Sequence, residues 1–188
     1  MKSRKIRIIG GDWRGRRLTV IDADGLRPTP DRIRETLFNW LATDCRGARV
    51  LDCFAGSGAL GFEALSRGAG SLVAFEQNLQ AVKNLREQAQ RLGSEAVEIV
   101  AGDALQLISS LKQQFDIVFI DPPYGNAELR TGVLLRLEAG QYLRDGCMIY
   151  FEWPRSEAFE LPSENLQWCK QKSAGQVNYA IAEWRLSS

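Results

Sequence analysis

The chain has 188 residues, a length that fits one domain, and its apolar content of 45% and charged content of 25% are typical of a protein with one core. It contains no apolar run near the ~18 residues of a membrane span and no secretory signal, which favours the cytoplasm. It has no histidine and no C-x-x-C pair among its four cysteines. The missing histidine excludes the commonest general base, a zinc site would need an unusual ligand set, and we expect no metal site.

The charge is unevenly distributed along the chain. The net charge is +1, but residues 1–20 alone carry +6 and the remainder carries −5. A basic arm on a mildly acidic body is typical of a protein that binds an anionic polymer, although a solvated basic tail has the same composition. The basic residues of the arm are Lys2, Arg4, Lys5, Arg7, Arg14, Arg16 and Arg17.

The first elements in the chain are two predicted short strands, Arg4–Ile9 and Arg17–Ile21, joined by a glycine-rich turn. The first strand alternates apolar and basic side chains, the pattern of a half-buried strand. We therefore divide the chain into a small basic β-hairpin extension over residues 1–25 and a main domain over residues 26–188.

A helix is predicted directly after this extension. Thr29 is a good N-cap residue and Pro30 suits the first helical position. An apolar face with helical spacing then continues to about Ala42. Arg32 and Arg34 lie two residues apart on this helix and so point in different directions.

From residue 48 onward, predicted strands and helices alternate. The strands are near-continuous apolar runs, as in parallel strands covered on both faces. They are Arg49–Phe54, Leu72–Glu76, Val97–Ala101, Asp116–Ile120 and Met148–Glu152, with helices at Ala59–Arg67, Leu79–Leu92, Ala104–Gln113 and Glu128–Leu143. Two last strands, Leu166–Lys172 and Asn178–Leu186, form an antiparallel hairpin. This order predicts an α/β fold with a doubly wound, mostly parallel sheet.

The clearest motif is a glycine-rich turn between the first of these strands and the helix after it. Gly56, Gly58 and Gly61 match G-x-G-x-x-G, which lets the backbone turn tightly against a ligand. Glu76 ends the next strand, where a carboxylate accepts hydrogen bonds from a ribose diol. The motif predicts an adenosine-type cofactor, and it leaves a nicotinamide or flavin enzyme open.

Two aspartates favour S-adenosylmethionine as that cofactor. Asp52 lies at the tip of the strand, where its carboxylate repels a pyrophosphate but suits the ammonium of a methionine moiety. Asp103 follows a third strand and can accept a hydrogen bond from an adenine amine, although a helix N-cap has the same appearance. The expected cofactor contacts are Asp52, Phe54, Ala55, Gly56, Ser57, Gly58, Glu76, Asp103, Ala104 and Asp121.

The segment Asp121-Pro122-Pro123-Tyr124 follows an apolar strand and so lies at the same edge of the sheet. The two prolines stiffen the turn and have no N–H, so nearby carbonyl groups and the Asp121 carboxylate form a cluster of acceptors. Such a cluster holds both N–H groups of an exocyclic amine and directs its lone pair at an electrophilic methyl group. Tyr124 offers a flat face on which a base stacks. We predict these four residues to be catalytic.

Asp121-Pro122-Pro123-Tyr124 resembles motif IV of the amino-methyltransferases, and the segment from Asp52 to Gly61 resembles their motif I. The stretches Gly10–Leu18 and Leu26–Phe38 resemble the bacterial 16S rRNA guanine-N2 methyltransferases called RsmD. That resemblance spans the whole chain. It implies a Rossmann-like class I methyltransferase that uses S-adenosylmethionine. The expected substrate is one guanine of 16S ribosomal RNA, in the small subunit or its assembly intermediate. Nothing in the sequence requires more than a monomer.

The tetrapeptide alone does not determine the base, because related enzymes methylate adenine N6 or glutamine side chains. An adenine-N6 methyltransferase of DNA or RNA, a glutamine methyltransferase and a non-catalytic RNA-binding module therefore remain alternatives. Trp13 either stacks on a base or anchors its turn. The residues expected to contact RNA are Arg4, Lys5, Arg7, Trp13, Arg14, Arg16, Arg17, Arg32 and Arg34.

Overall fold

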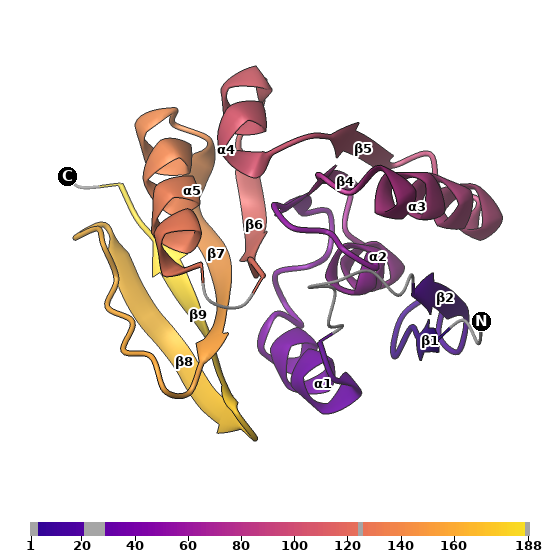
Figure 1. The fold of residues 1–188 in the computed structure, drawn as a ribbon, viewed down its shortest axis with the longest axis horizontal. Helices are drawn as coiled ribbons and strands as arrows, with labels where there is room; N and C mark the ends of the chain where they lie inside the picture. The colour runs from indigo at the N-terminus through magenta and orange to yellow at the C-terminus, as the bar shows by residue number, and fades with distance from the viewer. Residues whose placement is uncertain (1–3, 21–28, 124–125, 187–188) are drawn as a thin grey trace.

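A computed structural model describes residues 4–20, 29–123 and 126–186 of the chain. Its main feature is a seven-stranded sheet in the order β5-β4-β3-β6-β7-β9-β8 (Figure 1). The strands are β3 (Arg49–Asp52), β4 (Ser71–Glu76), β5 (Val97–Ala101), β6 (Phe115–Ile120), β7 (Leu143–Pro154), β8 (Leu166–Ala174) and β9 (Val177–Trp184). Strands β3 to β7 are parallel, and β9 pairs antiparallel with both β7 and β8. The predicted doubly wound sheet with a closing hairpin is confirmed.

Helices cover both faces of the sheet. They are α1 (Asp31–Trp40), α2 (Ala59–Ser66), α3 (Leu79–Leu92), α4 (Ala104–Leu107) with a 3-10 turn at Ile108–Ser110, and α5 (Ala127–Ala139). Side chains from α1, α2 and α3 join one buried apolar cluster, and side chains from α4 and α5 join a second cluster on the opposite face (Figure 1). None of the helices in the described part of the chain has the length and apolar character needed to cross a membrane.

Three predicted element boundaries are wrong by three residues or more. The helix expected to reach Leu143 ends at Ala139, because Gln141 adopts a left-handed φ of 58° that no helix continues through. Leu143 instead begins β7, a strand of 12 residues rather than the predicted five. The helix expected to reach Gln113 breaks after a 3-10 turn, where Leu111 is extended. The predicted strand end at Ile21 falls outside the described residues.

The expectation that Thr29 caps α1 is also wrong. Pro30 occupies the N-cap position with an extended backbone, and no side chain caps the helix there. Thr29 is buried, and its hydroxyl donates to the Asp121 carboxylate at 3.4 Å. Its hydroxyl is therefore used in a contact between segments 92 residues apart rather than in a local cap.

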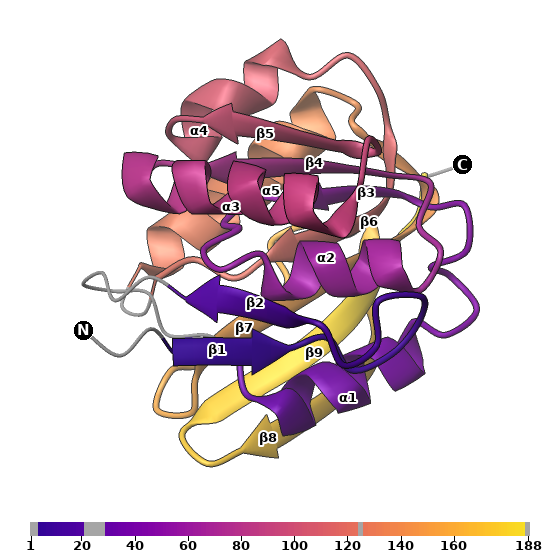
Figure 2. The same ribbon diagram turned by 90° about the vertical axis from the view of Figure 1, so that its right-hand side faces the viewer.

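The N-terminal strands β1 (Arg4–Arg7) and β2 (Arg17–Val20) pair antiparallel as a separate two-stranded sheet. The hairpin lies on the same side of the large sheet as α1 and α2 (Figure 2). Ile8 and Leu18 are about 1% exposed and belong to the main apolar cluster. The basic extension is thus packed into the body through its apolar face, which leaves its basic face outward.

A buried carboxylate in α2 holds this hairpin in place. Glu63 is fully buried, and its two oxygens accept the backbone N–H groups of Ile9 and Gly10, each at 2.8 Å. The same carboxylate pairs with Arg67 at 2.8 Å and with Arg34 at 3.5 Å. Charged and hydrogen-bonded groups of this kind are costly to leave without partners in a dry interior. Glu63 therefore connects the hairpin, α1 and α2.

The predicted RNA contact of Arg34 is wrong. Its side chain is 0% exposed, and Nη2 donates to the Arg7 carbonyl at 3.0 Å and to Asp31 at 2.7 Å. A side chain without exposed atoms cannot reach RNA, so we assign Arg34 to the packing of the hairpin against α1. Its neighbour Arg32 is exposed, as expected for residues two apart on a helix.

Replacement of Glu63 should detach the hairpin from the body. We expect Glu63→Gln to lower the free energy of unfolding by about 3 kcal/mol, because Arg34 and Arg67 each lose an ion pair with Glu63 and the amide leaves one oxygen for the N–H groups of Ile9 and Gly10. Denaturant unfolding of the variant measures this loss. The control Glu98→Gln changes an exposed strand carboxylate and should stay within about 0.5 kcal/mol of the parent. Equal stability of the two variants would contradict the role of Glu63.

Candidate active site

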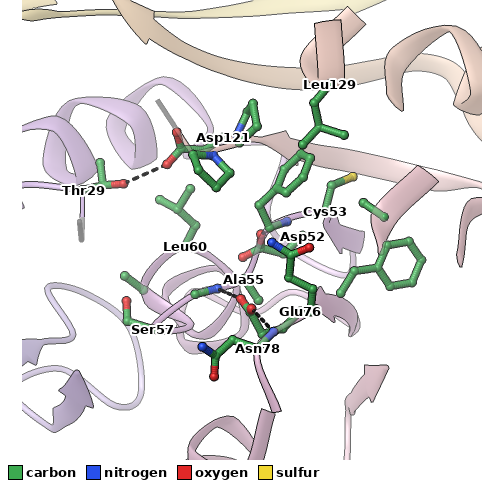
Figure 3. A pocket seen from close by; sticks show the side chains of 18 of the residues that line it. Thr29, Asp52, Cys53, Ala55, Ser57, Leu60, Glu76, Asn78, Asp121 and Leu129 are labelled. Carbon is green, nitrogen blue, oxygen red and sulfur yellow. Dashed lines mark hydrogen bonds between the residues drawn. The ribbon is translucent and has the colours of Figure 1, made fainter. Parts of the chain in front are cut away.

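A pocket opens at the carboxyl edge of the parallel strands (Figure 3). The chain leaves β3 toward β4 and β5 on one side and returns at β6 on the other, so the loops after β3 and β6 diverge. Ligands of doubly wound folds bind at such a switch point. The residues that line the pocket include Thr29, Asp52, Phe54, Ala55, Gly56, Ser57, Glu76, Asp103, Ala104, Asp121, Pro122, Pro123 and Glu152.

The glycine-rich turn forms one wall of the pocket. Gly56 and Gly58 have φ values of 53° and 79°, which side chains rarely adopt. A Cβ at Gly58 would lie 2.5 Å from the Phe62 ring, so this position also lacks space. Gly58 begins α2 and, of the predicted cofactor residues, is the one that does not line the pocket. Gly58 therefore permits the turn, and its contact with a ligand stays a prediction.

Glu76 fixes the glycine-rich turn to the end of β4. It is 7% exposed, one of its oxygens accepts the Gly56 N–H at 2.8 Å, and the other accepts the Asn78 N–H at 2.7 Å (Figure 3). A carboxylate has about four acceptor positions, so these two bonds leave capacity for a ligand hydroxyl. Glu76 thus sets the shape of the pocket and also faces into it. The sequence had indicated only that Glu76 faces the ligand.

Asp52 lies at the tip of β3 and is 3% exposed. Burial, with a smaller contribution from the negative charge of Glu76, raises its pKa from 3.8 to about 7. The Phe54 N–H, which donates at 3.3 Å, opposes this shift. The site therefore holds a carboxylate in surroundings that favour its neutral form. A ligand cation would reverse that preference, whereas a second anion would make it stronger.

Asp103 and Ala104 form the far wall of the pocket, after β5. Asp103 caps α4 by accepting the Gln106 N–H at 3.2 Å, and it is half-buried and lines the pocket. The two readings of this aspartate from the sequence, helix cap and ligand contact, are therefore compatible. One oxygen suffices for the cap.

Asp121 follows β6 directly and faces the pocket together with Pro122 and Pro123. Burial raises the pKa of its carboxyl well above the usual range, and the charges of Glu152 and Asp52 raise it further. The hydrogen bond from Thr29 opposes these effects and ties Asp121 to the start of α1 (Figure 3). Tyr124, the last residue of the predicted catalytic tetrapeptide, lies outside the described residues.

Sequence reasoning missed Glu152, which lies in β7 and lines the same pocket at 5% exposure. The Tyr150 hydroxyl donates to its Oε2 at 2.8 Å. A signal was present, because one acidic residue interrupts the otherwise apolar and aromatic run Met148–Trp153. That run was interpreted as an ordinary buried strand, in which a carboxylate is rare unless it has a partner.

A second, basic groove lies next to the pocket, between the hairpin and the start of α1. Its lining residues are Lys5, Ile6, Arg7, Arg17, Thr29, Pro30 and Asp31. Thr29 lines both hollows, so the groove and the pocket are neighbours. Arg7 and Arg17 face each other in the strand register. The groove thus provides positive charge beside the acidic pocket, although Asp31 neutralises part of it through an ion pair with Arg7.

The other predicted RNA residues occupy the turn and the exposed surface of the hairpin. Arg14 and Arg16 are exposed, and Arg16 donates to the Arg91 carbonyl at 3.4 Å. Arg4 lies opposite Val20 in the register of β1 and β2. Trp13 is half-buried against the main core, and its backbone N–H donates to Ser66 at 2.9 Å. These contacts make Trp13 an anchor of the turn.

The family model described as Conserved hypothetical protein 95 matches residues 6–183. The Ribosomal RNA small subunit methyltransferase D of Escherichia coli is 42% identical over 179 residues, covering 95% of this chain and 90% of its own length. The protein of the same name from Haemophilus influenzae is 39% identical and covers 94% of this chain and 93% of its own length. The match therefore includes the hairpin as well as the pocket.

A solved structure, a putative methyltransferase named yhhF from Escherichia coli, has a TM-score of 0.90 with 37% identity. The alignment covers 98% of this chain and all of that chain. This agreement confirms the predicted Rossmann-like methyltransferase fold.

The raised pKa of Asp52 makes a testable contribution to stability. The unfolded carboxyl has a pKa near 3.8 and the folded one near 7, so the folded state holds the extra proton between these values and loses stability as the pH rises through that range. Between pH 5.5 and pH 8 this one group should remove about 2 kcal/mol.

Asp52→Asn removes the titrating group and keeps an acceptor for the Phe54 N–H. The variant should therefore gain about 2 kcal/mol on the parent protein between pH 5.5 and pH 8, measured as the difference in unfolding free energy without ligand. A difference that does not change with pH would mean that Asp52 is ionised throughout.

Proposed function

The chain belongs to the family of Conserved hypothetical protein 95, which includes the ribosomal RNA small subunit methyltransferases D. We propose that it transfers a methyl group from S-adenosylmethionine to the N2 amine of a guanine in 16S ribosomal RNA. The substrate is the small subunit or its assembly intermediate. The observation that carries this proposal is the position of Asp52 and Asp121, two carboxylates with raised pKa values at the ends of adjacent strands in one pocket.

The residues of the pocket fit the methyl donor. Asp52 is a buried carboxylate that an ammonium group stabilises, and a pyrophosphate cofactor would place negative charge against it. This argument favours S-adenosylmethionine over a dinucleotide on the same glycine-rich turn. Glu76 retains acceptor capacity for the ribose, and Asp103 faces the place where the adenine would lie.

Bound S-adenosylmethionine supplies an electrophilic methyl group on a sulfonium, so the protein has to position the nucleophile and manage its proton. Asp121 accepts an N–H of the guanine amine and directs its lone pair toward the donor. Pro122 and Pro123 hold the backbone carbonyls of the turn in place because their φ angles are fixed. The raised pKa makes the Asp121 carboxylate a better proton acceptor than an exposed aspartate when the methylated nitrogen releases its proton.

The basic groove is the proposed path of the RNA backbone. A target base must leave its stack to enter the pocket, so the phosphates on either side must be held close to the entrance. Lys5, Arg7 and Arg17 line the groove that shares Thr29 with the pocket. Arg14, Arg16 and Arg32 extend this exposed basic surface. In this proposal, residues 1–25 form an RNA-binding extension of the methyltransferase domain.

The first test of the function is transfer of labelled methyl groups to undermethylated small subunits, free 16S rRNA, DNA and protein, followed by nucleoside and amino-acid analysis. N2-methylguanosine formed mainly on the ribosomal particle is the expected result. Label in N6-methyladenine or methylglutamine would overturn the proposed substrate.

Replacement of Asp121 separates an enzyme from an RNA-binding module. We expect Asp121→Ala to lower the rate of methyl transfer by about 100-fold or more, because both an amine acceptor and a proton acceptor are lost. Affinity for S-adenosylhomocysteine should stay within about threefold, since Asp52, Glu76 and Asp103 remain. The control Asp145→Ala removes an exposed aspartate from β7. Full activity of the Asp121 variant would exclude the proposed role.

Replacement of Arg17 tests the groove. Arg17→Ala should weaken RNA binding and flatten its salt dependence by about 0.7–0.9 in log–log slope, because one phosphate contact is lost. The matched control is Arg46→Ala, which removes an exposed arginine before β3, at the opposite edge of the sheet. Binding titrations at several salt concentrations give both slopes. If the salt dependence of RNA binding has the same slope in Arg17→Ala as in Arg46→Ala, the groove does not bind the RNA backbone.

A further inference from the structure

The pocket contains an acceptor that the reaction described above does not use. Glu152 belongs to β7, which pairs in parallel with β6, and the last register pair before the pocket joins Ile120 to Phe151. Asp121 and Glu152 are the next residues of the two strands, and both line the pocket. Among the charged groups near Asp121, Glu152 has the largest effect on its pKa. Two carboxylates therefore lie side by side at the mouth of the sheet.

The orientation of Glu152 is set by the protein. Tyr150, two residues earlier on the same face of β7, is fully buried and donates its hydroxyl to Glu152 Oε2 at 2.8 Å. A carboxylate has about four acceptor positions, enough for contacts within the protein and one from a ligand. Burying a carboxylate beside another one costs free energy, and packing of the strand does not require a carboxylate at this position. This placement favours a function in the pocket.

We propose that Glu152 accepts the N1–H of the target guanine while Asp121 accepts its N2 amine, so that the pair of carboxylates selects guanine over other bases. The proposal rests on the methyl-transfer function proposed above and names the group that chooses its substrate. Guanine presents an N1–H donor and an N2 amine next to each other on one edge. Two adjacent acceptors match that edge, and each charge-assisted hydrogen bond is stronger than a neutral one.

The same pair rejects the other amine-bearing bases. In adenine the atom beside the N6 amine is N1, and in cytosine the atom beside the N4 amine is N3; both carry a lone pair instead of a proton. Such a base would turn a lone pair toward the Glu152 carboxylate, so two acceptors would face each other and no hydrogen bond would form between them. The turn at Asp121 alone holds any exocyclic amine, so the choice of base requires a second contact of this kind.

The role of Glu152 is tested by comparing methylation of the target guanine with methylation of 2-aminopurine at the same position. 2-Aminopurine keeps the amine at C2 but has a lone pair at N1. After nucleoside mapping has located the target, small subunits are assembled from 16S rRNA ligated with either base. Wild-type protein should prefer guanine by roughly 100-fold in kcat/KM, the value of one charged hydrogen bond with a buried partner.

Glu152→Gln should remove most of that preference. The Tyr150 hydroxyl would hold the amide oxygen and turn the amide N–H toward the base, so activity on guanine should fall by roughly 100-fold while activity on 2-aminopurine should rise. Tyr150→Phe keeps the carboxylate but releases Oε2, and it should give an intermediate ratio. Affinity for S-adenosylhomocysteine should be unchanged in both variants. Glu98→Gln, on an exposed strand position, is the matched control.

Each outcome decides the proposal. A guanine to 2-aminopurine ratio that stays at the wild-type value in both variants would overturn the role of Glu152 and leave the methyltransferase function intact. The same holds if the wild type shows no preference. Wild-type protein that forms no N2-methylguanosine on any substrate would overturn the proposed function itself, and that result is seen before any variant is made.

Discussion

The carboxylates of Asp52, Asp121 and Glu152 share one pocket over an apolar core, and the rest of the site follows from this concentration of acidic side chains with little exposure to water. Burial and nearby negative charge raise the pKa values of Asp52 and Asp121 and so favour the neutral forms of these two side chains. A ligand that restores their charge must bring cations or several N–H donors. A methyl donor with an ammonium and a sulfonium brings the first, and a guanine edge brings the second. In the proposed function, binding of the two substrates therefore offsets the free-energy cost of holding these carboxylates close together.

The backbone around these carboxylates is held by contacts that have no chemical role. Glu76 binds the glycine-rich turn through the Gly56 N–H, and Thr29 binds Asp121. Without these ties, like charges would move apart toward water. The positive φ values of Gly56 and Gly58 permit the tight turn from β3 into α2. Because these contacts fix the polar groups before the substrates bind, little free energy is needed to rearrange them during the displacement reaction.

Sequence reasoning predicted the sheet, its hairpin and most of the pocket, because long apolar runs and glycine or proline turns are local signals. It failed where a side chain is used at long range. Thr29 has the local features of a helix cap but contacts Asp121, and Arg34 has the appearance of a surface arginine but is buried against Glu63. Glu152 was hidden in an apolar run, since only the pairing of β7 with β6 places it beside Asp121.

In the proposed function, the docking of the hairpin links RNA binding to the chemistry. Glu63 fixes Ile9 and Gly10 to α2, and Arg34 fixes the carbonyl of Arg7 to α1. The basic groove is therefore formed by two segments whose spacing the body of the protein sets. Because Thr29 lines both the groove and the pocket, a phosphate held in the groove lies at a defined position relative to Asp121. A base that leaves its stack then meets the carboxylates of Asp121 and Glu152. An RNA is therefore methylated only when its phosphates fit the groove and its target base reaches these carboxylates at the same time.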